Sequence, residues 1–329
     1  MVNGGSALTA RGVRMEYRDR ASDARLVAIE NMDLDVADGE FVSLLGPSGC
    51  GKSTFLKIVN GLLRATAGEI RLRGTGKGRE DAMVFQDAAL FPWYSVLDNV
   101  AYGLVCAGVK RSEARRRAQP LIDLVGLAGF ADRYPYQLSG GMQQRANLAR
   151  ALAVDSEILL MDEPFTGLDP LNLVLLRDAV MELRDRGRTL ILSTHQMEAA
   201  EAMCESVAII DRGRLVAGGK VRDLKRASGR RTLRIALEGD TAPAWLTELP
   251  GMAAARLNAG GAELDLLPAA DPAAILSAVI ARGAAIARFE VVEPSLEALF
   301  IEHVGRPADD ETEPVPDGLA PSVSAGGVA

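Results

Sequence analysis

The sequence predicts an α/β fold with a mostly parallel sheet, because short apolar runs alternate with segments of helical periodicity. One of these runs leads directly into a glycine-rich turn, which is a second observation favouring this fold class. Near residue 225 the pattern changes to shorter strand-like runs, which predict a separate small α+β domain. The expected organisation is a first domain over 1–225, a second over 226–306 and a disordered tail over 307–329.

The expected elements follow from local patterns. Alternating and β-branched residues predict strands in the first domain at 12–17, 26–36, 41–45, 82–85, 158–161, 189–193, 207–211 and 214–217. Helices are expected at 52–63, 98–129 and 171–186, and the basic stretch 110–117 is interpreted as a solvated helix face. The second domain has expected strands at 232–237, 262–267 and 287–292 and a helix at 271–282. The tail is rich in proline and acidic residues and lacks lysine and arginine, which predicts disorder.

Composition narrows the function classes. With 48% hydrophobic and 25% charged residues, the chain of 329 residues has the composition of a globular protein. Its net charge of −7 disfavours a nucleic-acid partner. No apolar run reaches the roughly 18 residues that cross a bilayer, and residues 1–17 lack a secretory signal. The cysteines Cys50, Cys106 and Cys204 show no metal-type spacing, so we expect a cytoplasmic protein.

The glycine-rich turn carries the pattern G-x-x-x-x-G-K-[ST] between an expected strand and an expected helix. It comprises Gly46, Pro47, Ser48, Gly49, Cys50, Gly51, Lys52, Ser53 and Thr54. The glycines let consecutive backbone N–H groups turn toward phosphate oxygens, and the helix adds its positive dipole end. We therefore expect Lys52 to reach the β- and γ-phosphates of a nucleoside triphosphate and the Ser53 hydroxyl to hold Mg²⁺.

Two acidic residues, Asp162 and Glu163, follow the strand expected at 158–161. Ligand sites of parallel sheets lie at the carboxyl ends of the strands. We expect Asp162 to join the metal shell and Glu163 to polarise the attacking water as a general base. Alone, such acids are interpreted as a loop cap, but the phosphate loop favours the catalytic interpretation.

Residues 138–145, Leu-Ser-Gly-Gly-Met-Gln-Gln-Arg, resemble the signature of the ATP-binding cassette (ABC) family. Ser139 alone would be an ordinary helix N-cap, but the order of the other motifs matches the family from residue 8 to about 225. The resemblance implies a RecA-like P-loop NTPase core with an antiparallel β subdomain and a helical subdomain at about 87–138. It also implies an ATPase that uses ATP and Mg²⁺.

The resemblance assigns roles to further positions. Tyr17 lies where the family stacks an aromatic ring on adenine, with a partly buried strand aromatic as the alternative. Gln86 matches the glutamine that touches Mg²⁺ and the attacking water, and His195 matches the switch histidine that contacts the γ-phosphate. Ser139, Gly140, Gly141 and Asp169 match residues that address the ATP held by a second copy of the chain or a similar subunit.

The resemblance also implies a transmembrane permease as partner, and hence a peripheral position on the inner face of the cell membrane. Residues 85–100 are similar to the nitrate, sulfonate and taurine importer branch, which favours import of a small solute delivered by a solute-binding protein. Residues 167–219 and 291–300 instead resemble the ATPases of drug and antibiotic exporters, which leaves export as the alternative.

Two other function classes are less well supported. A soluble ABC ATPase acting on nucleic acid or ribosomes is disfavoured by the acidic charge and by the lack of sustained heptads between Lys52 and Ser139. A regulatory nucleotide-binding module without turnover is disfavoured by the intact Glu163 and His195.

Overall fold

The computed structural model describes residues 5–18, 25–73, 81–229, 231–238, 243–258, 260–267 and 269–305. The chain forms two compact units, of which the second spans Gly219–Gly305. The helix α7 (Val221–Ala227) therefore belongs to the second unit, although the sequence predicted the change at about residue 225. The disorder predicted for 307–329 lies outside the described residues.

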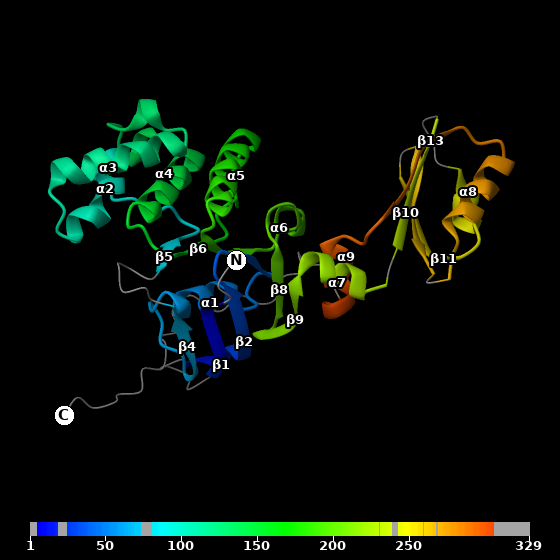
Figure 1. Ribbon diagram of the computed structural model, residues 1–329, viewed down its shortest axis with the longest axis horizontal. Coiled ribbons are helices and arrows are strands. Elements are labelled where there is room, and N and C mark those ends of the chain that lie inside the picture. The colour runs from blue at the N-terminus through cyan, green and yellow to red at the C-terminus, as the bar shows by residue number, and fades with distance from the viewer. Residues whose placement is uncertain are drawn as a thin grey trace. The chain divides into compact units, whose positions relative to one another are not determined.

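The first unit is built on one sheet with strand order β4-β1-β2-β9-β8-β3-β7-β6-β5, which confirms the predicted α/β class (Figure 1). The strands are β1 (Ser6–Arg18), β2 (Arg25–Ala37), β3 (Phe41–Leu45), β4 (Ala67–Leu72), β5 (Asp81–Val84), β6 (Ile158–Asp162), β7 (Thr189–Thr194), β8 (Ser206–Asp211) and β9 (Arg214–Lys220). Of these, only β4 has no counterpart among the expected strands. It is an edge strand with a mostly exposed burial pattern, so its sequence lacks the apolar run of the others.

Half of this sheet is parallel and aligns the carboxyl ends of its strands. β3 pairs in parallel with β7 and β8, and β6 pairs in parallel with β5 and β7. The register sets Leu45 opposite Thr194 and Asp162 opposite Ser193. The chain segments that follow β3, β6 and β7 therefore emerge at one edge of the sheet.

The other half of the sheet is mostly antiparallel. β1 pairs with β2 and with β4 in antiparallel registers. β8 and β9 are neighbours joined at Arg212 and Gly213, which have φ of 47° and 73°. Two consecutive positive φ values are typical of the tight turn of a β-hairpin, as the sequence predicted here.

The helices of the first unit are α1 (Lys52–Val59), α2 (Val96–Cys106), α3 (Arg111–Leu124), α4 (Gly140–Leu152), α5 (Pro170–Asp185) and α6 (Met197–Met203). α1 is shorter than predicted, because Gly61 adopts φ of 78° and the chain turns away. The helical segment expected at 98–129 is broken at Gly108, with φ of 86°, into α2 and α3. On α3, Arg116 and Arg117 form ion pairs with Glu113 across an exposed face.

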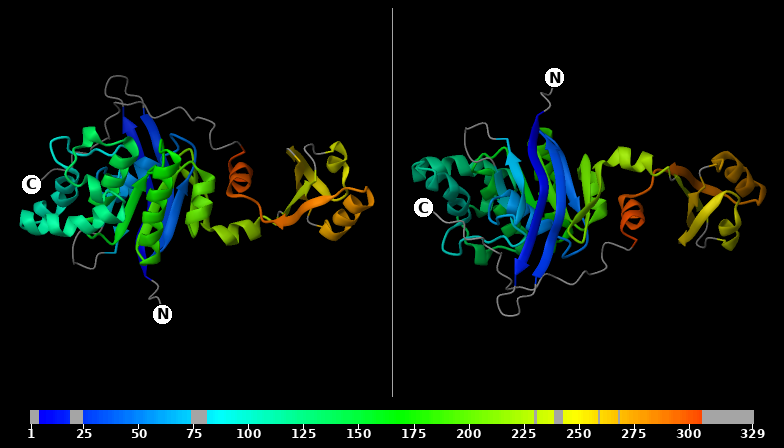
Figure 2. Two further views of the ribbon diagram at one scale, coloured as in Figure 1. Left: turned by 90° about the horizontal axis from the view of Figure 1, so that it is seen from above. Right: turned by 90° about the horizontal axis from the view of Figure 1, so that it is seen from below.

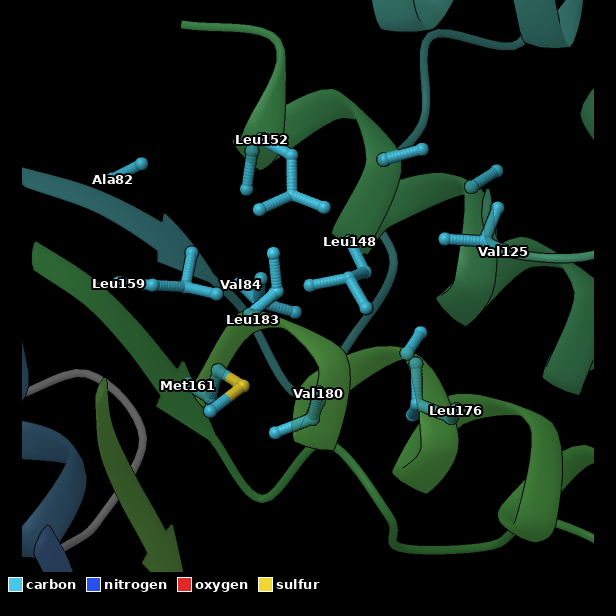
Figure 3. Close-up of a cluster of buried hydrophobic side chains, with 14 of the residues drawn as sticks. Ala82, Val84, Val125, Leu148, Leu152, Leu159, Met161, Leu176, Val180 and Leu183 are labelled. Atoms are coloured by element: carbon cyan, nitrogen blue, oxygen red, sulfur yellow. The ribbon is translucent and has the colours of Figure 1, made fainter. Parts of the chain in front are cut away.

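The core between the helices and the parallel strands is apolar. In Figure 3, side chains of α4 and α5 meet those of β5 and β6. The labelled members include Val84, Leu148, Leu152, Leu159, Met161, Leu176, Val180 and Leu183. Figure 2 shows the cyan-green helices α2 and α3 at one side of the sheet in two further views. This packing holds α4 and α5 against β6, the strand that ends in Asp162.

We expect Leu148→Ala to lower the free energy of unfolding of the first unit by about 2 to 5 kcal/mol, because the change leaves a cavity in this core. Leu148 is 1% exposed. Leu171→Ala is the control, since Leu171 on α5 is 68% exposed and its truncation should cost less than about 0.5 kcal/mol. Urea unfolding measures both variants. Equal losses would contradict the assignment of Leu148 to the core.

The second unit has a four-stranded antiparallel sheet of order β11-β12-β10-β13. Its elements are α7, β10 (Arg231–Leu237), the 3₁₀ helix Ala244–Glu248, β11 (Met252–Asn258), β12 (Gly261–Leu266), α8 (Pro272–Ala281), β13 (Ile286–Val292) and α9 (Leu296–Val304). Buried apolar residues of β10, β12 and α8 form its core. The sequence predicted β10, β12, β13 and α8 but not β11, whose burial pattern is mostly exposed.

None of the helices in the part of the chain that the structure describes has both the length and the apolar character needed to cross a lipid bilayer.

Candidate functional site

The turn between β3 and α1 needs its glycines for steric reasons. Gly49 and Gly51 have φ of 77° and 108°. A Cβ on Gly46 would lie 2.2 Å from the carbonyl oxygen of Ile210, and one on Gly51 would lie 2.6 Å from that of Ala28. Neighbouring strands therefore press on the turn from outside, and side chains at these positions would displace it.

Lys52 lies inside this turn. Its side chain is 5% exposed, and its ammonium Nζ donates to the carbonyl oxygens of Gly46 at 2.7 Å and Pro47 at 3.1 Å. The same Nζ lies 3.4 Å from Oε1 of Glu163. The turn thus encloses a cation at the start of a helix, an arrangement that attracts an anion such as phosphate.

Two hydroxyl groups converge on Asp162 at the end of β6. Ser53 Oγ on α1 donates to Asp162 Oδ1 at 2.8 Å, and Ser193 Oγ on β7 donates to the same oxygen at 2.6 Å. Asp162 is 4% exposed. The parallel register explains the meeting, since it brings residues distant in sequence to the same sheet edge.

Glu163 follows immediately and has a φ of 44°, which is uncommon for a residue with a side chain. Its backbone N–H donates to both the carbonyl oxygen and Oγ of Ser193, each at 3.1 Å. Its Oε2 lies 3.1 Å from Nδ1 of His195 and accepts from the Thr166 hydroxyl at 3.4 Å. The unusual backbone thus holds the carboxylate between Lys52 and His195.

The predicted signature residues lie at the start of α4. Ser139 is the N-cap of this helix, and its Oγ accepts from the N–H of Met142 at 3.3 Å. Ser139 and Gly140 are exposed, whereas Gly141 is buried against Asn172 of α5. A Cβ on Gly141 would lie 2.5 Å from Cγ of Asn172, so glycine is required there for packing.

Asp169 caps α5 beside this contact. Its carboxylate accepts from the backbone N–H of Asn172 at 3.1 Å and from the Asn172 side-chain amide. These hydrogen bonds lower the pKa of Asp169. Asp169 is exposed, as are Ser139 and Gly140, so all three are accessible to another molecule. Sequence reasoning missed Asn172, whose side chain lies between the two segments.

Two of the predicted site residues lie apart from these contacts. Tyr17 on β1 is 9% exposed and packs in the buried apolar cluster between β1, β2 and α1, as the alternative of a strand aromatic anticipates. Gln86 is exposed in the segment after β5, and within the described residues its side chain makes no hydrogen bond to Asp162 or Glu163. Their roles toward ATP remain predictions.

Cys50 is buried in the glycine-rich turn, and this burial raises the pKa of its thiol. Cys204 is also buried, with its pKa raised for the same reason, whereas Cys106 at the end of α2 is exposed. A buried, protonated thiol is a poor nucleophile. Cys50 therefore acts as a small packing residue in the turn.

This site has a glycine turn around a buried lysine and a serine–aspartate pair, both at one edge of a parallel sheet. These features define the class of P-loop nucleotide-binding proteins. The sequence model of the ABC transporter family matches residues 29–166. A second model, described as the C-terminal domain of DrrA1-3-like ATP-binding proteins, matches residues 219–304. The two matches fall on different units of the structure.

Individual proteins similar to this chain are also ABC ATP-binding proteins. The taurine import ATP-binding protein of Roseobacter denitrificans is 44% identical over 187 residues, which are 56% of this chain and 70% of that protein. An uncharacterized ABC transporter ATP-binding protein of Methanocaldococcus jannaschii is 42% identical over 190 residues, 56% of this chain and 71% of that protein. A solved dimeric ATP-binding cassette in a post-hydrolysis state with ADP and Pi has 30% identity and a TM-score of 0.60, covering 65% of this chain and 99% of that one. The chain belongs to the ABC transporter family, as an ATPase subunit that binds ATP.

Proposed function

We propose that the residues gathered at the sheet edge bind and hydrolyse ATP to drive transport through separate permease subunits. The observation that carries this proposal is the convergence of Lys52 and His195 on the Glu163 carboxylate, next to the Ser53–Asp162 pair. The loop Gly46–Thr54 would surround the phosphates, with Tyr17 beside the adenine.

The chemistry follows from the charges. The Glu163 carboxylate lies 3.4 Å from the Lys52 ammonium, so it would act as the base and accept the proton of the water that attacks the γ-phosphate. Lys52 would exchange its carbonyl partners for phosphate oxygens and balance their negative charge. His195, hydrogen-bonded to Glu163, would orient the carboxylate and contact the γ-phosphate.

The residues present fit a Mg²⁺ ion that arrives with ATP. Ser53 and Asp162 supply hydroxyl and carboxylate oxygens 2.8 Å apart, which are ligands that Mg²⁺ prefers. Gln86 would add an amide oxygen from the segment after β5. Among the described residues no cluster of three or more His, Cys, Asp or Glu could hold a metal ion alone. The phosphates would therefore complete the shell, and bound Mg²⁺ would supply neutralisation of their charge.

We expect removal of Mg²⁺ with EDTA to abolish ATP hydrolysis, and re-addition of Mg²⁺ to restore it. A colorimetric phosphate-release assay on the purified chain measures both steps. The control is the same titration in excess Ca²⁺, a larger ion with longer oxygen distances, which should support less turnover. Undiminished hydrolysis in EDTA would rule out the proposed metal role of Ser53 and Asp162.

A second copy of the chain, or a similar subunit, would complete the site. Ser139, Gly140 and Asp169 are exposed on the same pair of helices, α4 and α5, and are joined there through Gly141 and Asn172. Hydrogen-bond donors at a helix start suit a γ-phosphate held by the partner. The dimeric solved cassette supports this proposal.

The permease would dock near an exposed aromatic cluster, defined as Phe91, Trp93, Tyr94 and Tyr102. Trp93 is 67% exposed, and ring centroids within the cluster lie as close as 4.6 Å. Trp93 and Tyr102 are exposed and follow Gln86 in the same part of the chain, and exposed aromatic rings suit contact with another protein. This docking would place the chain on the inner face of the membrane.

The proposed direction is import of a small solute of the nitrate, sulfonate or taurine type, supplied by a solute-binding protein. The similarity to a taurine import ATP-binding protein supports it. The second candidate is an ATPase of a drug or antibiotic exporter, and the resemblance of residues 167–219 and 291–300 to such ATPases favours it. Co-purification of the tagged chain from membranes tests the choice, because an exporter-type permease recovered without a binding-protein-dependent one would refute import.

A further inference from the structure

Three side chains on one face of α4 hold the loop that follows β5. Gln144 Nε2 and Asn147 Nδ2 both donate to the carbonyl oxygen of Phe85, at 2.9 and 3.2 Å. Arg150 donates to the carbonyl oxygens of Ala88 at 3.1 Å and Ala89 at 2.8 Å. The loop between these carbonyls contains Gln86.

The three side chains are also bonded to one another. Asn147 Nδ2 lies 3.4 Å from Oε1 of Gln144, and Arg150 Nη2 donates to Asn147 Oδ1 at 2.9 Å. They are spaced three residues apart, so they share one side of the helix. We call this set the polar ladder. Because its members are hydrogen-bonded to one another, we expect a change in one to disturb the others.

Arg150 is the member with the most contacts. Its guanidinium also lies over the ring of Phe91, 5.8 Å from the centroid. Burial lowers its pKa, and in the described part of the chain no carboxylate forms an ion pair with it. The positive charge of the guanidinium is therefore stabilised by carbonyl dipoles of the loop and by the face of an aromatic ring. An arginine that faces solvent would be stabilised by water instead.

The loop that Arg150 holds is strained and leads to the aromatic cluster. Ala89 has a φ of 42°, an uncommon value for a residue with a Cβ. Two residues later, the N–H of Phe91 donates to Asn99 Oδ1 at 2.8 Å, and Asn99 is 0% exposed on α2. The ring of Phe91 lies 5.7 Å from that of Trp93. Arg150 thus contacts both the strained backbone and the first ring of the cluster.

The other end of α4 carries Ser139. The helix has 13 residues, or about 20 Å, and it is stiff over that length. We propose that Arg150 is a positioning residue which, together with Gln144 and Asn147, fixes the 85–89 loop to α4. Through this attachment, the aromatic cluster is coupled to the ATP site. The inference rests on the proposed roles of Ser139 and Gln86, and deepens them by naming the side chains that join them.

The coupling has an intrinsic reporter, because the chain contains 2 tryptophans, Trp93 in the cluster and Trp245 in the second unit. The experiment uses the full chain with Trp245→Phe and Glu163→Gln, so that Trp93 alone emits and bound ATP is not consumed. ATP with Mg²⁺ is added while Trp93 emission is recorded, and equilibrium dialysis with labelled ATP measures occupancy separately. Thermal unfolding shows that each variant is folded.

We expect ATP to shift the Trp93 emission of the parent. Arg150→Lys keeps the charge but lacks the planar fork that reaches two carbonyls, so it should bind ATP within about threefold of the parent and lose about half or more of the Trp93 response. The matched control is Arg117→Lys on α3, which is 57% exposed and should keep the full response. Asn147→Ala removes a second bond to the same loop, should act in the same direction, and replaces Arg150→Lys if that variant does not fold.

A full Trp93 response in Arg150→Lys at equal ATP occupancy would overturn the inference. So would a parent that binds ATP without any change at Trp93. A parent that does not bind ATP at all would instead refute the proposed function, and occupancy distinguishes this result from the other two.

Discussion

Glu163→Gln should lower ATP turnover by about 100-fold or more while ATP still binds, since the amide cannot accept the proton that the carboxylate takes. Glutamine matches glutamate in size, and its side-chain amide can keep a hydrogen bond to the Thr166 hydroxyl. The variant should therefore accumulate with ATP bound, as a dimer if a second copy closes the site. Phosphate release and size-exclusion chromatography with ATP measure the two effects.

The matched control for this prediction is Glu198→Gln. Glu198 is exposed in the first turn of α6, and its substitution removes the same charge as Glu163→Gln. It should hydrolyse ATP at the rate of the unchanged chain. If Glu163→Gln retains turnover comparable to that control, Glu163 is not the base, and another group must take the proton.

Lys52→Ala should weaken ATP binding by roughly 30-fold or more, because truncating one partner of a buried charge pair costs about 2 to 5 kcal/mol. The Lys52 side chain is 5% exposed, and its ammonium has its carbonyl partners within the phosphate loop. The variant also leaves the Glu163 carboxylate without its nearby cation, so added triphosphate would meet uncompensated negative charge. Titration with a fluorescent ATP analogue measures the affinity.

Lys57→Ala serves as the comparison, since Lys57 lies in the last turn of the same helix. It should bind ATP like the unchanged chain. Similar losses in both variants would mean that α1 has been disrupted as a whole, and not that the loop ammonium binds phosphate.

Buried strands were the features most predictable from the sequence. β3 has the predicted bounds, because all five of its residues are buried and glycines stand at its ends. Two of the edge strands, β4 and β11, were missed for the opposite reason, because they expose most of their residues. In β4 charged residues interrupt the apolar ones, and the apolar part of β11 is mostly alanine, which does not favour a strand. The ends of helices were predicted less well, because they depend on backbone conformations such as the positive φ of Gly61. The periodicity of the sequence does not indicate these conformations.

Within the candidate site, the motif residues were predictable because their spacing is local. The contacts between motifs were not. Asn172 contacts Gly141 although the two residues lie on different helices, and no local sequence pattern indicates this packing. The polar ladder was also missed, since Gln144, Asn147 and Arg150 look like ordinary polar residues of a helix until the loop after β5 is placed against them.

The distribution of the cysteines makes the chain convenient for labelling. Two of its 3 thiols, Cys50 and Cys204, are buried with raised pKa values, whereas Cys106 is exposed. Thiol-reactive dyes attack accessible thiolates, so a maleimide probe should attach first at Cys106 without removal of the other cysteines. Cys106 ends α2, the helix that also carries Tyr102. A dye there would sit next to the surface on which we expect the permease to bind, and would report its arrival in the unmutated protein.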